Sequence, residues 1–245
     1  MEILIIFIIL FALLFTGLPV FLSLGSLAAG IILFSGQNLS SLAGTMYGSM
    51  DNFVLLAIPL FTLMAQIMAK GGVGDDLFDF VHVWLRHLPG GLAITTVVAC
   101  SLFAAICGSS TATALTIGTL AIPAMLRYKY DKPFTLGLLA AGGTLGILIP
   151  PSGPMIIYGA ITDTSVGKLF IAGILPGIAI SLLFIIYCWF HSRRLPELAK
   201  ESSSTWPEKG VALKRVAFSL ILPPVIIGGI YSGAFTPTEA AGVGA

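Results

Sequence analysis

Two short stretches of this chain carry the groups that could do chemistry. Residues 108–113 hold four Ser or Thr hydroxyls in five consecutive positions after a glycine, and residues 142–154 read GGTLGILIPPSGP. Proline lacks a backbone N–H and clashes with the preceding turn, and glycine weakens the helical bias, so we expect a helix to break in the second stretch. A broken helix exposes carbonyl oxygens. Carbonyl and hydroxyl oxygens are the ligands that hard cations such as Na⁺ prefer.

The composition places both stretches inside a membrane. Of the 245 residues, 57% are hydrophobic and only 9% are charged, whereas a soluble domain carries roughly 25% charged residues. The apolar runs are continuous rather than alternating, which predicts an all-α polytopic membrane protein. The net charge of +1 provides no basic face, which argues against nucleic acid as a partner.

The sequence gives little support for metal binding, nucleotide hydrolysis or enzymatic catalysis. The three histidines lack a metal-binding spacing such as HExxH, and no glycine-rich loop ends in Lys-Ser or Lys-Thr. The three cysteines lie in apolar segments without ligand-like spacing, so we predict that they are small core residues. The chain is therefore not expected to be an enzyme or to hold a prosthetic group.

Basic residues set the predicted orientation. They gather in three loops, at residues 86–87, 127–132 and 193–215. The positive-inside rule places these loops in the cytoplasm, so the apolar block 92–126 begins and ends on one side. Each arm of that block has about 15 residues, fewer than the roughly 20 that a span needs. We therefore predict a re-entrant hairpin over 92–126 with its tip at 108–113, followed by a broken helix over 134–161.

The hairpin tip and the helix break are suited to binding an ion and an anionic substrate. A single hydroxyl in a membrane helix commonly bonds back to the preceding turn, but four at the midpoint of a hairpin favour a binding site. Proton-driven carriers usually place ionisable side chains at membrane depth, and these segments have none. Coupling to Na⁺ fits better, and the flanking helix N-termini suit a carboxylate.

At these motifs the sequence resembles the large membrane subunit of TRAP (tripartite ATP-independent periplasmic) transporters. The resemblance rests on residues 107–114, 133–137, 142–154 and 235–239. It implies a multi-pass permease of the bacterial inner membrane, built as the first inverted repeat of an elevator-type fold of the ion-transporter superfamily. It also implies a small membrane subunit, a periplasmic substrate-binding protein, and Na⁺-coupled uptake of organic acids such as C4-dicarboxylates or sialic acids.

The resemblance further implies roles for individual residues. The expected Na⁺ ligands come from the tip and from carbonyls of the broken helix: Gly108, Ser109, Ser110, Thr111, Gly142, Leu145, Ile147 and Pro150. The residues expected near the carboxylate of the substrate are Thr113, Pro151 and Ser152.

The resemblance also implies a division of the chain by role. The expected stretches are 1–70 (N-terminal membrane helices of the scaffold), 71–91 (polar interfacial connection), 92–165 (transport elements), 166–190 (scaffold helix), 191–215 (cytoplasmic linker) and 216–245 (membrane helix and start of a truncated second repeat). Residues 3–34 form either one long pass or two short ones.

The sequence is shorter than expected for the family, and alternative functions stay open. No second copy of the tip or break motif is found, although a helix-start signal at 236–239 opens what would be the next repeat. We therefore expect a fragment of a longer permease. One rival is a Na⁺/dicarboxylate symporter that needs no binding protein, and another is a non-transporting membrane scaffold subunit. An intramembrane enzyme would need a catalytic dyad at depth, and none is visible.

Overall fold

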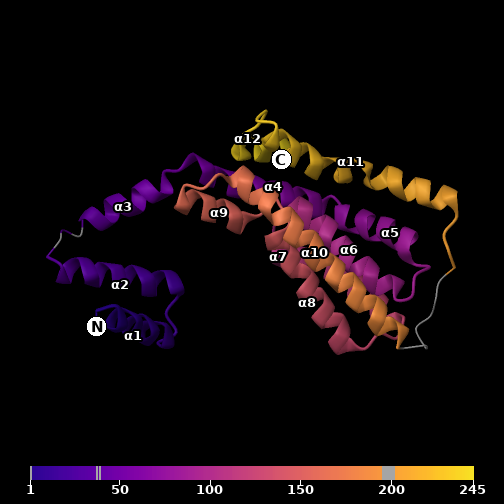
Figure 1. Cartoon of the computed structure of the whole chain (residues 1–245), viewed down its shortest axis with the longest axis horizontal. Coiled ribbons are helices and arrows are strands. Elements are labelled where there is room, and N and C mark those ends of the chain that lie inside the picture. Colours follow the sequence, from indigo (N-terminus) through magenta and orange to yellow (C-terminus); the bar gives the residue numbers. More distant parts are fainter. Residues whose placement is uncertain (1, 37, 39, 195–201) are drawn as a thin grey trace. The chain divides into compact units, whose positions relative to one another are not determined.

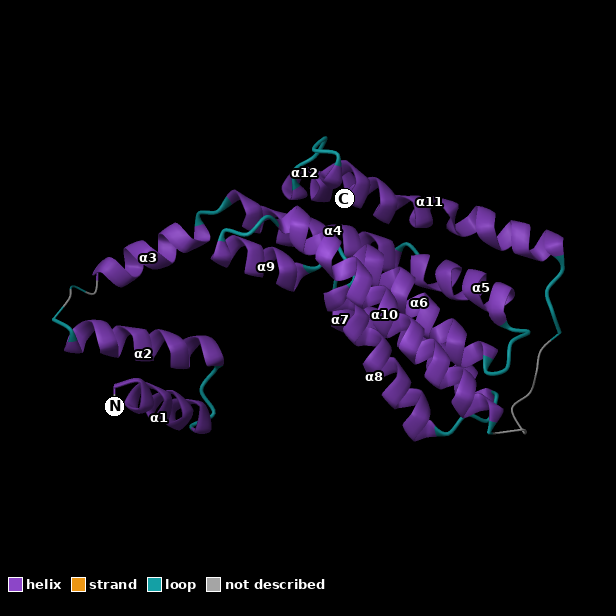
Figure 2. Ribbon diagram, viewed as in Figure 1, coloured by secondary structure: helices purple, strands orange, loops and turns teal. Residues whose placement is uncertain are grey.

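The computed structural model describes residues 2–36, 38, 40–194 and 202–245, and every regular element among them is a helix (Figures 1 and 2). The all-α prediction is therefore confirmed. The chain forms two compact units, Met1–Asn52 and Phe53–Ala245.

The first unit contains three helices: α1 (Glu2–Phe15), α2 (Val20–Phe34) and α3 (Ser40–Met50). Between α1 and α2 the chain turns at Gly17, whose φ of +80° suits a residue without a Cβ, and α2 then begins after Pro19. The apolar run 3–34 is thus two helices packed on one another. At 14 and 15 residues each is about 21–23 Å long, shorter than the hydrocarbon core of a bilayer.

Among its described residues, the second unit contains four segments long and apolar enough to cross a membrane. They are the short 3₁₀ turn η1 (Phe53–Leu56) with α4 (Ala57–Lys70), α8 (Lys132–Leu148) with α9 (Gly153–Thr162), α10 (Val166–Arg193), and α11 (Trp206–Tyr231). The other helices are α5 (Val73–Leu85), α6 (Gly91–Cys107), α7 (Ser110–Arg127) and α12 (Pro237–Gly244).

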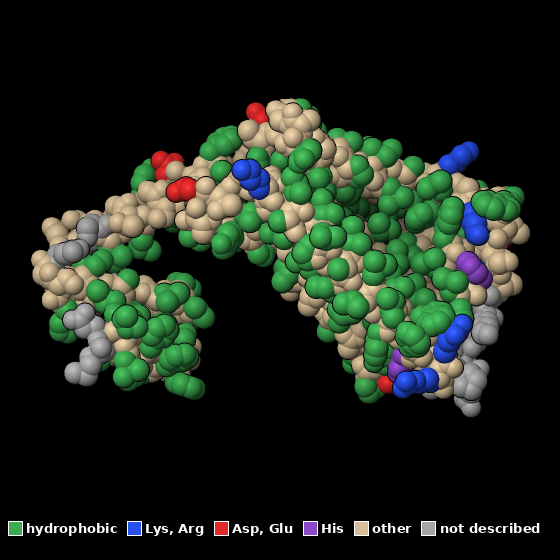
Figure 3. Space-filling view, in the orientation of Figure 1, with side chains coloured by type: hydrophobic (Ala, Val, Ile, Leu, Met, Phe, Trp, Pro, Cys, Tyr) green, Lys and Arg blue, Asp and Glu red, His purple; other side chains and the backbone are tan. Residues whose placement is uncertain are grey.

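The outer surface of this unit suits lipid. Large apolar side chains such as Leu175 and Phe218 are more than 70% exposed, which is costly in water but not in hydrocarbon. Figure 3 shows many apolar side chains on the visible face, with most of the visible Lys, Arg and His side chains toward one end and one Lys or Arg apart from them.

Helix α6 is the centre of the second unit. It is apolar all round and buried over most of its length, as expected of a helix enclosed by others. Phe103, at 0% exposure, is among its buried side chains, and α4, α5, α7, α8, α10 and α11 all pack against it. The first arm of the predicted hairpin is thus the least exposed helix of the fold.

The polar connection predicted over 71–91 contains an amphipathic helix. In α5 the residues Leu77, Phe78 and Val81 are buried at helical spacing, while Asp75 and Asp79 on the opposite face are exposed. The helix packs against α6 and α11.

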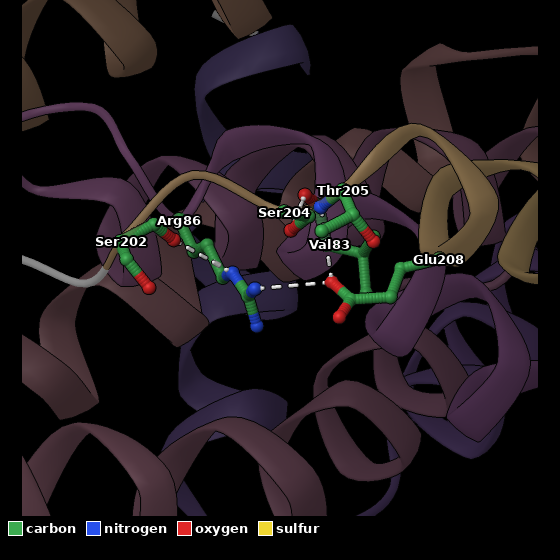
Figure 4. A network of polar contacts seen from close by, with 6 residues as sticks. All are labelled: Val83, Arg86, Ser202, Ser204, Thr205 and Glu208. Atoms are coloured by element: carbon green, nitrogen blue, oxygen red, sulfur yellow. Dashed lines mark hydrogen bonds and ion pairs between the residues drawn. The ribbon is translucent and has the colours of Figure 1, made fainter.

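The end of α5 is held to the start of α11 by a polar network (Figure 4). Arg86 donates through Nε to the Ser202 carbonyl at 3.0 Å and pairs with the Glu208 carboxylate at 3.2 Å. The Ser204 hydroxyl donates to the Val83 carbonyl at 2.6 Å. Part of the linker predicted over 191–215 lies outside the described residues. From Trp206 onward that linker is helical and continues into the span, because Thr205 and Glu208 form a capping box.

Candidate functional site

The proline-rich stretch interrupts its helix where the sequence predicts. Helix α8 ends at Leu148 and α9 begins at Gly153, so residues 149–152 are not helical. Pro150 and Pro151 cannot donate backbone hydrogen bonds, which prevents α8 from continuing. The Ser152 hydroxyl donates to the Ile147 carbonyl at 2.6 Å, so it satisfies one of the carbonyls that the end of α8 leaves open.

The hydroxyl-rich stretch forms a tight turn between α6 and α7. Gly108 has a φ of +58°, a conformation that favours glycine. Ser109 caps α7: its hydroxyl accepts from the Ala112 N–H at 3.4 Å, and its carbonyl accepts from the Thr113 hydroxyl at 2.8 Å. The arms α6 and α7 are 17 and 18 residues long and pack against each other.

Glycines bring the turn and the break into backbone contact. A Cβ added to Gly108 would overlap the Pro151 carbonyl, and one added to Gly146 would lie 2.6 Å from the Ser109 carbonyl oxygen. One added to Gly143 would lie 2.8 Å from the Cβ of Ala114. No side chain larger than hydrogen fits at these positions without a shift of backbone. The two stretches that the sequence singles out therefore form one site.

The hydroxyls of the turn differ in how available they are. Ser109 and Ser110 are half-buried and Thr111 is exposed, and the Ser109 and Thr111 hydroxyls lie 3.2 Å apart. Thr113 is fully buried and lies 3.1 Å from the Cys107 sulfur. The first three can reach a ligand at the tip, whereas the Thr113 hydroxyl is already engaged inside the hairpin.

The expected carbonyl ligands are spread along the end of α8. Leu145 accepts from the Ile149 N–H at 2.8 Å, and Ile147 accepts from Ser152. Pro150 is buried at the break. Gly142 lies further from the tip, since an added Cβ would lie 3.0 Å from the Cys100 sulfur. The structure thus brings Leu145, Ile147 and Pro150 to the break and places Gly142 deeper along α8.

A pocket of about 100 Å³ opens beside the turn. Cys107, Gly108, Ser109 and Ala112 form its wall on the hairpin side, and Pro151 and Gly153 form the wall at the break. The third wall is α4, through Ile58, Phe61, Thr62, Ala65 and Gln66. Sequence reasoning did not assign α4 to the site. The available signal was the pair Thr62 and Gln66, two polar residues one helical turn apart in an otherwise apolar span.

The pocket is uncharged, and apolar side chains make up most of its lining. Its lining contains hydroxyl, carboxamide and backbone groups and no charged side chain. The first turns of α7 and α9 border it through Ala112 and Gly153, and helix N-termini carry partial positive charge. Within the described part of the chain, no three His, Cys, Asp or Glu side chains gather as a transition-metal site would require.

Comparison with known proteins shows the family to which the chain belongs. The family model described as "Tripartite ATP-independent periplasmic transporter, DctM component" matches residues 7–245. The C4-dicarboxylate TRAP transporter large permease protein DctM of Pseudomonas aeruginosa is 46% identical over 220 residues, covering 89% of this chain and 51% of the relative. That of Vibrio cholerae is 40% identical over the whole chain and 54% of the relative.

A third relative has a different named substrate. The sialic acid TRAP transporter large permease protein SiaM of Vibrio cholerae is 39% identical, covering 94% of this chain and 54% of the relative. The chain spans about half the length of these curated relatives. It belongs to the DctM family of tripartite ATP-independent periplasmic transporters, a family of transporters and not of enzymes.

Proposed function

We propose that this chain provides the first inverted repeat of a large permease subunit that takes up an organic acid together with Na⁺. Its partners are a small membrane subunit and a periplasmic substrate-binding protein, and it lies in the bacterial inner membrane as a multi-pass protein. The relatives named for C4-dicarboxylate, sialic acid and ectoine support a carboxylate-bearing substrate. The four apolar segments support the membrane location.

The Na⁺ site lies where the hairpin turn meets the break. The observation that carries this proposal is the contact of Gly108 with the Pro151 carbonyl and of Gly146 with the Ser109 carbonyl. It brings the backbone of Ser109 and Ser110 against the end of α8 and the turn against the non-helical residues 149–152. Carbonyl and hydroxyl oxygens of these segments are the ligands that a Na⁺ ion needs. The remaining ligands are those expected from the resemblance: Gly108, Thr111, and the carbonyls around Gly142, Leu145, Ile147 and Pro150.

The carboxylate of the substrate binds on the pocket side of the same contact. Pro151 lines the pocket, whereas the hydroxyls of Thr113 and Ser152 each donate to a backbone carbonyl. For Thr113 or Ser152 to donate to a carboxylate, those bonds would have to break. The first turns of α7 and α9 border the pocket through Ala112 and Gly153. The Ala112 N–H already donates to the Ser109 hydroxyl, so the start of α9 is the helix N-terminus that offers backbone N–H groups to the carboxylate.

The hairpin is re-entrant and moves as part of an elevator. Residues 92–165, proposed as transport elements, correspond to the tightly packed α6 to α9. Helix α10, expected in the scaffold, packs closely on them: an added Cβ on Gly173 would lie 2.6 Å from the Leu148 carbonyl oxygen. The hydroxyls of Ser101 and Ser181 also lie 3.0 Å apart. This packing favours movement of α10 together with the hairpin and the broken helix.

The test is uptake by the permease reconstituted with its small subunit and binding protein in proteoliposomes. Labelled succinate, sialic acid and ectoine are offered with and without an inward Na⁺ gradient. Na⁺-driven uptake of one of them, lost in both Ser110→Ala and Pro150→Ala, supports the proposal. Thr119→Val is the matched control, because the Thr119 hydroxyl is exposed on α7 and bonds back to Thr116. Uptake that is unchanged by the Na⁺ gradient and by both site substitutions would overturn the proposal.

A further inference from the structure

Helix α4 contributes a polar side chain to the pocket that the site described above leaves without a role. Gln66 lies in the apolar span Phe53–Lys70 and lines the pocket opposite Gly108 and Ser109. No hydrogen bond within the described residues involves its carboxamide. Gln66 is exposed, and an amide without a partner is costly in an apolar environment, so its place in a mostly apolar pocket that Ser109 also lines is informative.

The other polar side chain on this face of α4 is already satisfied. The Thr62 hydroxyl donates to the Ile58 carbonyl at 2.7 Å, the usual arrangement for a hydroxyl within a helix. Of the two polar side chains that α4 presents to the pocket, only Gln66 therefore has both its donor and its acceptor available. Its carboxamide is also the longer group and extends further from the helix axis.

The size and lining of the pocket restrict what Gln66 can contact. A volume of about 100 Å³ accommodates a few water molecules or one carboxylate group, and it is smaller than the pockets that enclose whole small molecules. The lining has no cationic side chain. A carboxylate held there needs neutral N–H or O–H donors, and the Gln66 amide nitrogen supplies two.

We propose that Gln66 is a specificity-determining residue that donates hydrogen bonds to a carboxylate of the transported organic acid when that group occupies the pocket. The inference rests on the proposed function and adds α4 to its substrate site. Because Gln66 has no charge, it recognises the carboxylate without a counter-ion, and the hairpin turn supplies the opposite wall.

The test compares two substitutions at Gln66 in the reconstituted transporter. The acid that the wild type takes up best among succinate, sialic acid and ectoine is varied at saturating Na⁺, and Na⁺ is then varied at a fixed acid concentration. Gln66→Met keeps the size of the side chain but removes the amide. Gln66→Glu replaces the donor with a group of like charge to the substrate. Ile67→Met is the control, because Ile67 is exposed on α4 and does not line the pocket.

We expect Gln66→Met to raise the half-saturating acid concentration about tenfold, the effect of losing one hydrogen bond to a charged group. Gln66→Glu raises it further, while the half-saturating Na⁺ concentration changes less than about twofold in both. If only the Na⁺ dependence moves, Gln66 is a cation ligand and the inference is wrong. Unchanged acid dependence in both variants, with normal Na⁺-driven uptake by the wild type, also overturns it and leaves the proposed function intact. Absence of Na⁺-driven uptake in the wild type overturns both.

Discussion

The α-carbon of Gly108 lies directly against the backbone carbonyl of Pro151. This contact joins the turn of a helical hairpin to the break in a separate helix, and neither segment could approach so closely with a Cβ in the way. A site built from backbone in this manner depends on glycine rather than on charged ligands.

Gly108→Ala is expected to destabilise the fold. Alanine at a φ of +58° is strained, and its Cβ would also overlap the Pro151 carbonyl, so we expect a loss of about 2 kcal/mol, seen as a melting temperature about 5 °C lower. Thermal unfolding in detergent measures it. Gly137→Ala is the control, because an added Cβ there meets nothing within 4 Å and alanine favours the helix. Equal melting temperatures for the two variants would contradict the close approach.

Gly146→Ala is expected to impair transport. The new methyl group would lie 2.6 Å from the Ser109 carbonyl oxygen and 2.8 Å from the Ser110 nitrogen, so the turn must move away from α8. We expect Na⁺-driven uptake to fall at least about tenfold, the cost of misplacing ligands by a fraction of an ångström to an ångström. Gly118→Ala on α7, where an added Cβ makes only ordinary contacts at 3.8 and 3.9 Å, should keep uptake near that of the wild type. If Gly146→Ala and Gly118→Ala show the same Na⁺-driven uptake, the turn does not position the site.

A disulfide between Ser101→Cys and Ser181→Cys tests which elements move together. The two hydroxyls lie 3.0 Å apart, so cysteines there should form a disulfide under oxidation once the native cysteines are replaced. Because α10 packs on α6 and on the break, we expect the cross-linked transporter to keep most of its uptake. Uptake that stops on oxidation and returns on reduction would instead place α10 in the scaffold, as the sequence alone suggests.

Glu208→Ala is expected to loosen the start of α11 without affecting transport. The carboxylate pairs with Arg86 and accepts from the Thr205 N–H, and the substitution removes both a partly exposed ion pair and half of a capping box. We expect a loss of about 1 kcal/mol of stability, with uptake near that of the wild type. Glu208→Gln should lose less, because its side-chain oxygen can still accept from Thr205. A large loss of uptake in Glu208→Ala would show that the linker takes part in transport.

The sequence predicts the helix break and the turn well because proline and glycine act locally. Helix α8 ends at Leu148, two residues before Pro150, because the missing N–H groups of Pro150 and Pro151 prevent its continuation, and Gly108 sets the turn after α6. These constraints depend on neighbours in the chain and need no knowledge of packing. The capping box at Thr236 and Glu239 was predictable for the same reason.

What the sequence does not predict depends on which helices meet in space. Gln66 lies on α4, and only tertiary packing places it beside Ser109. Helix α10 packs closely on the break through Gly173 and Gly177. A run of apolar residues likewise does not predict this contact. The charged stretch before the last span reads equally as a linker or a surface helix, and it is helical from Trp206 because a cap and its contacts with α5 stabilise it.

Na⁺ binding to the purified permease tests the central claim most directly. The melting temperature is measured as NaCl replaces choline chloride at constant ionic strength, for the wild type and for Ser110→Ala, with Thr119→Val as the matched control. A ligand that binds only the folded state raises the melting temperature by an amount that grows with the logarithm of one plus the ratio of the ligand concentration to its Kd. We predict that Na⁺ stabilises the wild type and the control, and that Ser110→Ala needs at least about tenfold more Na⁺ for the same shift. An identical Na⁺ response in all three proteins would contradict a Na⁺ site at the contact between the hairpin turn and the broken helix.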